Sequence, residues 1–419
     1  MTLNLSRAAF AAALVAAATI GETHEASACG GCFVPLTEST QVTSHKMILS
    51  VSPEATTLWD QITYSGDPES FAWILPIKGT AEVGISADIL FQVINSETEV
   101  IVQQPFDGCS YACNFAGGGG GDGGNDVTIL DQEVVGPYET VQLQSSDPTA
   151  LGNWLTSHGY NIPPDIAPVI DSYVAEQFNF LALKLVPGKG LNAMKPVRIT
   201  TPGATPTLPL RMVAAGTGAV TPITLWVFGD GKYVPSNFPA FTINESELFW
   251  TWETQSSNYA LLRQGKFDAS DGKGWLVESA VTVQPSNIDY LVTSYGIKQY
   301  KDENGNWAAV NKDADLAALY GNLTPEDGVT VTRLLGQLSR AALLEDLQLE
   351  AAENQEDVQR VLVPWHQVDD PRCPGRPCDD ESNCAISHLP TDSKRALTVF
   401  GLMGIAMFIR RRRRHRTVI

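Results

Sequence analysis

Seven cysteines are the residues whose spacing most directly suggests chemistry in this 419-residue chain. They fall into three groups along the sequence: Cys29 and Cys32, Cys109 and Cys113, and Cys373, Cys378 and Cys384. A CxxC pair such as the first occurs in thiol redox centres, haem attachment sites, zinc sites and disulfides. Haem attachment requires a histidine directly after the second cysteine, and Phe33 stands there, so a c-type haem is excluded.

Three alternatives remain for the cysteine pairs. A four-cysteine zinc site has enough ligands, but oxidation competes with metal binding in an exported protein. A thioredoxin-like centre needs its CxxC at a helix start after a strand, whereas this CxxC lies near a chain end, before Pro35. We therefore favour local disulfides for Cys29, Cys32, Cys109, Cys113, Cys373 and Cys378, which leaves Cys384 over.

The first 28 residues have the layout of a secretory signal peptide. Arg7 precedes an apolar run over residues 8–20, and the small residues Ala26-Ser27-Ala28 follow a polar stretch. This order predicts export, with cleavage between Ala28 and Cys29. The mature chain would then begin at Cys29, where a free end frays unless it is fastened.

A short apolar segment near the other end predicts a membrane contact. Residues 396–409 would cover roughly 21 Å as a helix, less than the roughly 30 Å hydrocarbon core, and snorkelling arginines with local thinning can close this gap. Six arginines follow the segment and two cations precede it. This asymmetry predicts that the tail, residues 410–419, lies in the cytoplasm and the body outside.

A polar stalk rich in proline and cysteine, residues 366–395, separates the body from this apolar segment. The arrangement resembles the C-terminal sorting tails of some Gram-negative bacteria, including the MYXO-CTERM type. In such tails a membrane protease removes the helix, and an upstream cysteine is the processed, lipid-bearing site. The resemblance implies that Cys384 is that residue, so the helix is either a retained anchor or a sorting signal.

The body contains no recognisable catalytic constellation. Only His45, His158 and His366 lie within it, none in an HExxH motif, and no GxSxG elbow occurs. Each histidine is interpreted as a surface or hydrogen-bonding residue. We predict no catalytic, cofactor-binding or metal-binding residues and no cofactor, although an active site assembled only in three dimensions is compatible with the sequence.

Two loops carry residues that could bind ions. The glycine-rich run 117–124 lacks the Lys-Ser/Thr ending of a phosphate loop; oxygens of residues 122–126 could bind calcium, but a flexible loop is favoured. Residues 301–313 have the spacing of an EF-hand, yet Trp307 replaces the required glycine. A β-hairpin turning at Asn304-Gly305 between two strands is the favoured interpretation.

Charge and aromatic content bear on partners. The net charge is −19, and the chain between residues 29 and 393 contains 19 basic and 45 acidic residues. Such a body repels nucleic acid, so no nucleic-acid partner is expected. Dense aromatics between Trp226 and Tyr259 could line a glycan or peptide cleft, but core packing is favoured. The expected partners are the membrane and an envelope protein or glycan.

The elements that position these residues are mostly short strands. Strands are predicted at 71–77, 180–186, 208–215 and 223–229, and helices at 149–157, at 164–178 and after Thr324. The last prediction rests on Thr324 as N-cap, Pro325 and the apolar spacing that follows. We therefore predict an α+β fold, predominantly antiparallel, over residues 29–365, with a subdomain break near 110–127.

Several long strings resemble the DUF2330 family of exported bacterial proteins. They are ACGGCF at the mature start, TTLWDQITYSGDPESFAWILPIKG from Thr56, FNFLALKLVPG from Phe178, PVRITTPGATPTLPLRMVAAGTG from Pro196 and ITLWVFGDGKYVPSNFP from Ile223. The similarity extends from Cys29 to beyond Thr324. The resemblance implies a signal peptide, an extracytoplasmic body and a C-terminal anchor, and it supplies no catalytic residues. The sequence thus predicts an envelope protein with a structural or binding role, and the alternative is an extracytoplasmic hydrolase or thiol redox enzyme.

Overall fold

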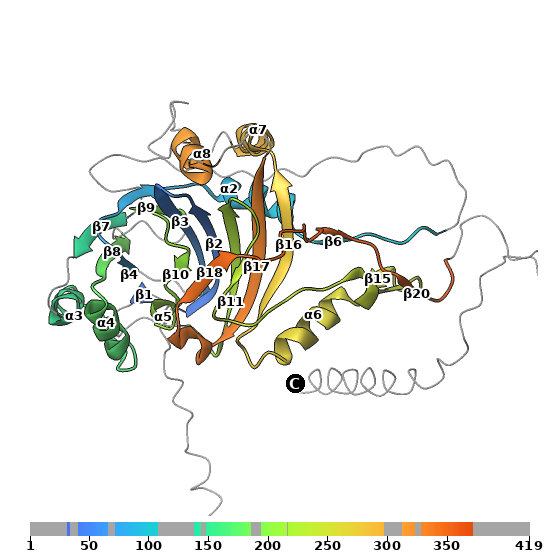
Figure 1. Cartoon of the computed structure of the whole chain (residues 1–419). Helices are drawn as coiled ribbons and strands as arrows, with labels where there is room; N and C mark the ends of the chain where they lie inside the picture. The colour runs from blue at the N-terminus through green and yellow to red at the C-terminus, as the bar shows by residue number, and fades with distance from the viewer. Residues whose placement is uncertain are drawn as a thin grey trace, which may run out of the picture. The chain divides into compact units, whose positions relative to one another are not determined.

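An eight-stranded mixed sheet forms the centre of the protein (Figure 1). The computed structural model describes residues 32–33, 41–65, 72–107, 138–143, 148–185, 194–215, 217–296, 312–321, 323 and 328–371. In spatial order the strands of the central sheet are β13 (Ala240–Phe241), β16 (Trp275–Val283), β17 (Val329–Ser339), β11 (Val220–Gly229), β2 (Gln41–Val51), β3 (Ala55–Ser65), β9 (Val197–Pro202) and β5 (Glu82–Ile85).

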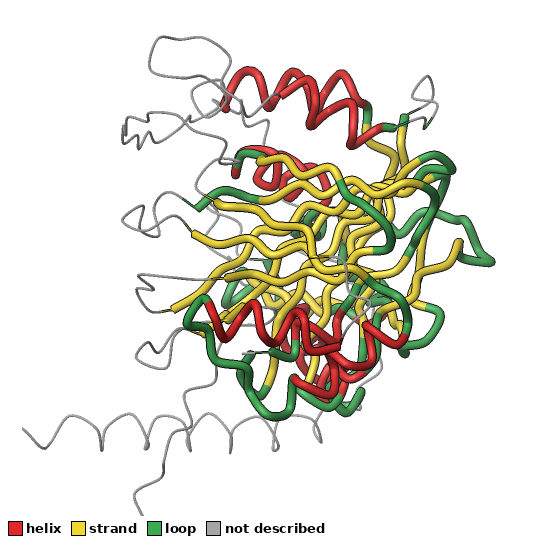
Figure 2. Tube along the Cα trace, turned by 90° about the vertical axis from the view of Figure 1, so that its left-hand side faces the viewer, coloured by secondary structure: helices red, strands yellow, loops and turns green. Residues whose placement is uncertain are grey.

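Most neighbouring strands of the central sheet are antiparallel. The exceptions are β11 with β2, where Ile223 lies opposite His45, and β13 with β16. Both faces of the sheet are covered, which explains why β11 is buried without interruption from Leu225 to Gly229. A helical layer covers one face, and a second β-layer covers the other. Figure 2 shows strands between two groups of helices.

Three helices cover the first face: α2 (Asp88–Thr98), α7 (Pro285–Gly296) and α8 (Lys312–Tyr320). Hydrogen bonds from buried residues of the sheet hold α8 and α2 against it. Ser50 Oγ donates to the Leu319 carbonyl at 2.7 Å, and Trp226 Nε1 donates to Thr98 Oγ1 at 2.8 Å. Where α2 meets α7, a Cβ on Gly296 would collide with the Ile89 side chain. Glycine is required there because the two helices approach so closely.

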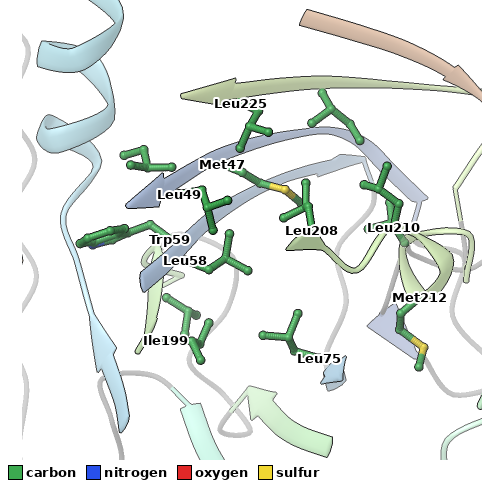
Figure 3. Packing of buried hydrophobic residues seen from close by; sticks show 14 of the residues in the cluster. Met47, Leu49, Leu58, Trp59, Leu75, Ile199, Leu208, Leu210, Met212 and Leu225 are labelled. Atoms are coloured by element: carbon green, nitrogen blue, oxygen red, sulfur yellow. The ribbon is translucent and has the colours of Figure 1, made fainter. Parts of the chain in front are cut away.

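A four-stranded sheet faces the other side. Its order is β1 (Cys32–Phe33), β4 (Ala72–Ile77), β8 (Asn179–Leu185) and β7 (Tyr138–Leu143). A three-stranded sheet of β10 (Thr207–Leu208), β18 (Leu347–Ala351) and β12 (Tyr233–Pro235) continues this layer together with α5 (Leu210–Val213). Figure 3 shows Met47 and Leu58 of the central sheet gathered with Leu75 and Leu208 of this layer, so the main core lies between the sheets.

Helices α3 (Pro148–Ser157) and α4 (Ala167–Ala175) lie beside the second layer. Arg211 of α5 fastens α4 by a bidentate ion pair to Glu176, with both distances 2.7 Å, and also binds Asp346 at 2.7 Å. The hydrogen bonds from Arg211 hold the pKa of Glu176 below its usual value. This network joins three segments that are far apart in the sequence.

A smaller lobe carries the remaining elements and its own apolar cluster around Leu248 and Leu276. The elements are the 3₁₀ turn Glu245–Glu247, β14 (Phe249–Thr251), β15 (Ser256–Ser257), α6 (Tyr259–Asp268), β20 (His366–Val368) and the pair β6 (Ile101–Val102) and β19 (Val361–Leu362). A further 3₁₀ turn, Ala342–Leu344, follows β17.

The predicted α+β fold is confirmed, and so are several individual elements. The strands predicted at 71–77, 180–186 and 223–229 are β4, β8 and β11, and the helices predicted at 149–157 and 164–178 are α3 and the shorter α4. Among the described residues, no helix is both long and apolar enough to cross a bilayer. The segment 396–409 and the signal peptide lie outside those residues.

The helix predicted after Thr324 is wrong, because residues 329–339 form the strand β17. Its β-branched start, Val329 to Thr332, is typical of a strand. Gly336 lies against the Trp275 ring, where a Cβ would come within 3.2 Å. The apolar spacing that suggested a helix belongs to a strand buried on both faces, which periodicity alone does not distinguish from a helix.

Two smaller predictions also need correction. The strand predicted at 208–215 is only the end of β10, and α5 then begins after Pro209, which cannot donate a hydrogen bond to a sheet. The loop at 301–313 was predicted to join two strands, but α7 and α8 flank it. Its proposed turn at Asn304-Gly305 lies outside the described residues, as does the glycine-rich run 117–124.

Candidate functional site

A buried histidine–aspartate pair lies on the hairpin formed by β2 and β3. His45 Nδ1 lies 3.2 Å from both carboxylate oxygens of Asp60. His45 and Asp60 expose only 1% and 3% of their surface. In the neutral tautomer in which Nδ1 donates to the carboxylate, Nε2 carries the lone pair. Nε2 is buried and has no hydrogen-bond partner among the described residues.

Strand alternation places this pair on the face that looks toward the second β-layer. His45, Met47 and Leu49 occupy alternate positions of β2, and all three are buried. On β3, Asp60 takes its place between Leu58 and Ile62 in the same way, with Asp60 opposite Met47 in the register. Two polar residues thus stand where the pattern calls for apolar side chains.

Asp60 lines a cavity of about 410 Å³. The end of β3, the strands β4 and β8, the segment 194–196 and the start of β9 lie around this cavity. Its apolar lining consists of Ile62, Trp73, Leu183, Met194, Pro196 and Val197. Its polar lining consists of Lys46, Asp60, Gln61, Thr63, Asp88, Tyr138 and Lys195. The volume lies within the range of small-molecule sites, and the mixture of one apolar wall with several charges is suited to a polar ligand.

Hydrogen bonds fix part of the cavity wall. Gln61 Nε2 donates to Asp88 at 2.6 Å, and Lys195 Nζ lies 4.0 Å from the same carboxylate. The Tyr138 hydroxyl donates to the Lys195 carbonyl at 2.8 Å and accepts from the Lys195 amide at 3.1 Å. In contrast, Lys46 is exposed, and its ammonium group forms no ion pair with the described residues. The wall therefore holds preorganised polar groups and one unmatched cation.

The arrangement suits recognition better than covalent chemistry. Asp60 orients His45 as a carboxylate orients the base of a hydrolase. However, the described lining offers only the hydroxyls of Thr63 and Tyr138 and no serine or cysteine that could act as a nucleophile. The cavity wall carries the charged side chains of Lys46, Asp60, Asp88 and Lys195.

Two other buried ionic groups hold the fold together. Asp315 of α8 accepts from Ser86 at 2.6 Å, from Arg198 at 2.8 Å and from Trp59 Nε1 at 3.2 Å. Burial raises the pKa of the Asp315 carboxyl, and these donors oppose the shift. On the same helix-covered face of the sheet, Glu278 pairs with Arg333 at 2.5 Å, and Arg333 also donates to Asn95 of α2 at 2.7 Å. The sheet register shifts at Glu278, between Val277 and Ser279.

Only some of the predicted site residues are among the described residues. Cys32 pairs through its backbone with Trp73, while Ala28, Cys29, Cys109, Cys113, Cys373, Cys378 and Cys384 lie outside the described residues. The disulfide predictions therefore stay predictions. Within the described part of the chain, no group of three or more His, Cys, Asp or Glu residues could hold a metal ion.

The predicted packing role of the aromatics is confirmed for most of them. Trp226, Phe228, Phe238, Trp250 and Trp252 are buried, whereas Phe249 exposes 45% of its surface. His45 proves to be a hydrogen-bonding residue, and His158 likewise lies near the Trp154 carbonyl, at 2.8 Å. The cavity itself was not predicted. The available signal was a polar residue at an inward position in each of two consecutive strands.

Comparisons with known proteins identify a family and little else. A search among curated proteins found no match. A solved structure described as the crystal structure of baculovirus P35 matches 49% of this chain and 78% of its own, at 10% identity and a TM-score of 0.24, which is too low to support an argument. A family described as "Uncharacterized protein conserved in bacteria (DUF2330)" matches residues 23–261, more than half of the chain. The match ends before the region beyond Thr324 to which the resemblance was expected to extend, and on its strength the chain belongs to the DUF2330 family.

Proposed function

We propose that this protein is an exported, membrane-anchored component of the bacterial envelope that binds a small polar ligand without transforming it. The layout of residues 1–28 supports export, and the apolar segment 396–409 with its arginines supports anchoring or sorting at the membrane. Membership of a bacterial family agrees with this location. The ligand would bind in the cavity beside Asp60.

The cavity carries this proposal. Asp60 is buried and still reaches the cavity, and the fixed groups Asp88 and Lys195 stand on its wall. Asp60 differs from the buried carboxylates Asp315 and Glu278, which hold the fold together, because Asp60 lines the cavity and can contact a ligand there. Recognition of a polar ligand would give the buried Asp60 and the part-exposed Asp88 and Lys195 a common role.

Binding can be tested on the full chain by calorimetry and thermal shift. The probes are amino acids, tripeptides, polyamines, dicarboxylates and monosaccharides. Ile62→Trp places a larger side chain in the cavity, and Ile101→Trp is the matched control on the exposed strand β6. We expect one class to bind the wild type and the Ile101→Trp variant, and to bind Ile62→Trp at least about tenfold more weakly, as loss of about 1.4 kcal/mol implies. Absence of binding by every class, or equal binding by both variants, would contradict the proposal.

The second candidate is an extracytoplasmic enzyme, which Nε2 of His45 favours because it has no hydrogen-bond partner among the described residues. In a hydrolase this atom would remove a proton from a nucleophile or water. Turnover of ester and amide substrates that disappears in His45→Gln would support that function over binding alone. For the thiol redox version, mass spectrometry under non-reducing conditions would have to find Cys29 and Cys32 in both oxidised and reduced forms.

A further inference from the structure

The cavity contains a stretch of unpaired strand edge. β3 pairs with β2 along its whole length, up to Ser65 opposite Gln41. On its other side β3 pairs with β9 only as far as Asp60 opposite Val197. Gln61, Ile62 and Thr63 therefore continue a strand whose outer edge has no strand partner among the described residues, and all three line the cavity.

This edge presents backbone groups that need partners. In an antiparallel sheet, alternate residues of a strand direct their N–H and C=O groups to opposite neighbours. Beyond Asp60, the described residues supply no strand on the outer side of β3. Such an edge is a template for an extended segment from another molecule.

We infer that the ligand is a short peptide, bound in extended conformation along the edge of β3 at Gln61–Thr63, with a positively charged group on Asp60. This inference rests on the proposed function and names its ligand class. Hydrogen bonds to the backbone of β3 would supply sequence-independent affinity, and the two sides of the cavity would receive alternate side chains.

Asp60 is the group that would select a positively charged side chain of the peptide. Its only described side-chain partner is His45, and both contacts are 3.2 Å, longer than the 2.7–2.9 Å that is typical of charge-assisted bonds. A carboxylate accepts about four hydrogen bonds, so acceptor capacity remains for an ammonium or guanidinium group. Trp73 lines the same cavity and offers an aromatic surface, which cations also favour.

Lys46, on the opposite face of the hairpin from Asp60, fits the negatively charged end of such a peptide. Lys46 lies opposite Gln61 in the register, so alternation places it on the face away from Asp60. Because β9 no longer covers β3 there, the cavity includes residues from both faces. The unmatched ammonium of Lys46 can receive the carboxylate of an unprotected peptide.

The cavity walls favour a peptide over a second folded copy. Trp73, Tyr138 and Leu183 stand around the edge and limit the space to about 410 Å³. A short flexible chain can enter a recess of this size, whereas the edge of another sheet, with its flanking layers, is too bulky. The edge is thus protected from the sheet-to-sheet pairing that exposed edges invite.

Calorimetry on the full chain with three unprotected tripeptides tests the inference. The probes are Ala-Lys-Ala, Ala-Glu-Ala and an Ala-Lys-Ala methylated on its backbone nitrogens. We expect Ala-Lys-Ala to bind at least about tenfold more tightly than the other two, since each lacks one proposed interaction. Asp60→Asn keeps an acceptor for His45 and should abolish the preference for lysine, while the exposed Asp230→Asn should leave it unchanged.

The outcomes separate this inference from the proposed function. Binding of a non-peptide ligand that Ile62→Trp weakens, without peptide binding, would overturn the inference and leave the proposed function standing. Equal affinity for the methylated peptide would overturn the strand-edge mode. A dimer in light scattering that Ile62→Trp dissolves would assign the edge to a second copy instead. No binding of any probe would overturn both proposals.

Discussion

Asp315 illustrates how single residues hold the layers together. Its carboxylate is fully buried and links α8 to three separate segments through Ser86, Arg198 and Trp59. Removing one partner from such a group leaves a buried charge uncompensated, which costs far more than losing a surface ion pair. The position is therefore a sensitive test of the fold.

We expect Arg198→Met to lower the free energy of unfolding by about 3–5 kcal/mol at neutral pH, measured by denaturant titration. Without Arg198 the folded-state pKa of Asp315 rises further above its unfolded value. A carboxyl whose pKa is higher in the folded state stabilises that state fully at pH values below its unfolded pKa. This stabilisation is lost as the pH rises through the folded pKa. The cost of the substitution should therefore shrink as pH falls toward about 4.

Arg340→Met is the control, because it breaks an ion pair with Asp165 in which both side chains are well exposed. Its cost should stay below about 1 kcal/mol and change little with pH. Equal costs for the two arginine substitutions would show that burial of Asp315 does not govern its contribution.

The cavity shows what sequence reasoning at the residue scale could not supply. Asp60 and Lys195 are 135 positions apart, and neither belongs to a motif. They share one cavity only because β3 lies beside β9, a pairing between segments about 140 residues apart in the chain. In contrast, the burial of Trp226 and Trp250 follows from residue type and was predicted correctly.

At the scale of elements, β1 shows how the predicted mature end is fastened. Only Cys32 and Phe33 belong to β1, yet they pair with Trp73 and Ala72 of β4, and the Phe33 side chain is completely buried. The sequence predicted that this end needs a fastening and favoured a disulfide. Strand pairing and one core phenylalanine already provide a fastening without any covalent bond.

We expect Phe33→Ala to lower the free energy of unfolding by about 3–5 kcal/mol, because it leaves a cavity in the main core. Phe106→Ala is the matched control, since Phe106 exposes 84% of its surface. That substitution should change stability by less than about 0.5 kcal/mol. Denaturant titration of both variants makes the comparison, and a small effect of Phe33→Ala would mean that β1 is dispensable.

The contact of α2 with α7 gives a second prediction for elements. Gly296→Ala should destabilise the protein by about 1–3 kcal/mol, because the new methyl group collides with Ile89. Gly265→Ala in the exposed part of α6 meets no atom within 4 Å, and it should stabilise by about 0.5–1 kcal/mol through helix propensity. Thermal melts of the two variants should therefore shift in opposite directions.

Element types were predictable where side-chain pattern and length agreed. β4 and β8 are short, apolar and bounded by turn residues, and they were predicted correctly. β17 was not predicted correctly, because a strand buried on both faces does not alternate between apolar and polar residues. Its apolar residues match the spacing of a helix by chance. Its place between β16 and β11 depends on tertiary contacts that no local pattern contains.

At the scale of the whole molecule, the signal peptide and the apolar C-terminal segment predicted from the sequence determine the compartment in which the cavity would meet its ligand. We expect the protein in the membrane fraction, resistant to high salt and released by detergent, with Cys29 as its first residue. Intact mass analysis of that material tests both ends at once. Residues 396–416 in the mass would identify a retained anchor, and their loss after processing at Cys384 would identify a sorting tail. A soluble protein that still carries residues 1–28 would contradict the proposed location.

The position of β17 has a consequence for how the chain reaches its native state. This strand lies inside the central sheet, between β16 and β11, but it is the last of the eight along the chain. Until residue 339 has been made, β11 and β16 each carry a bare edge that can pair with the wrong partner. The central sheet therefore closes late, through contacts of high sequence separation that form slowly. The segment that defines the family, residues 23–261, contains neither β16 nor β17, so the rest of the chain must complete its fold.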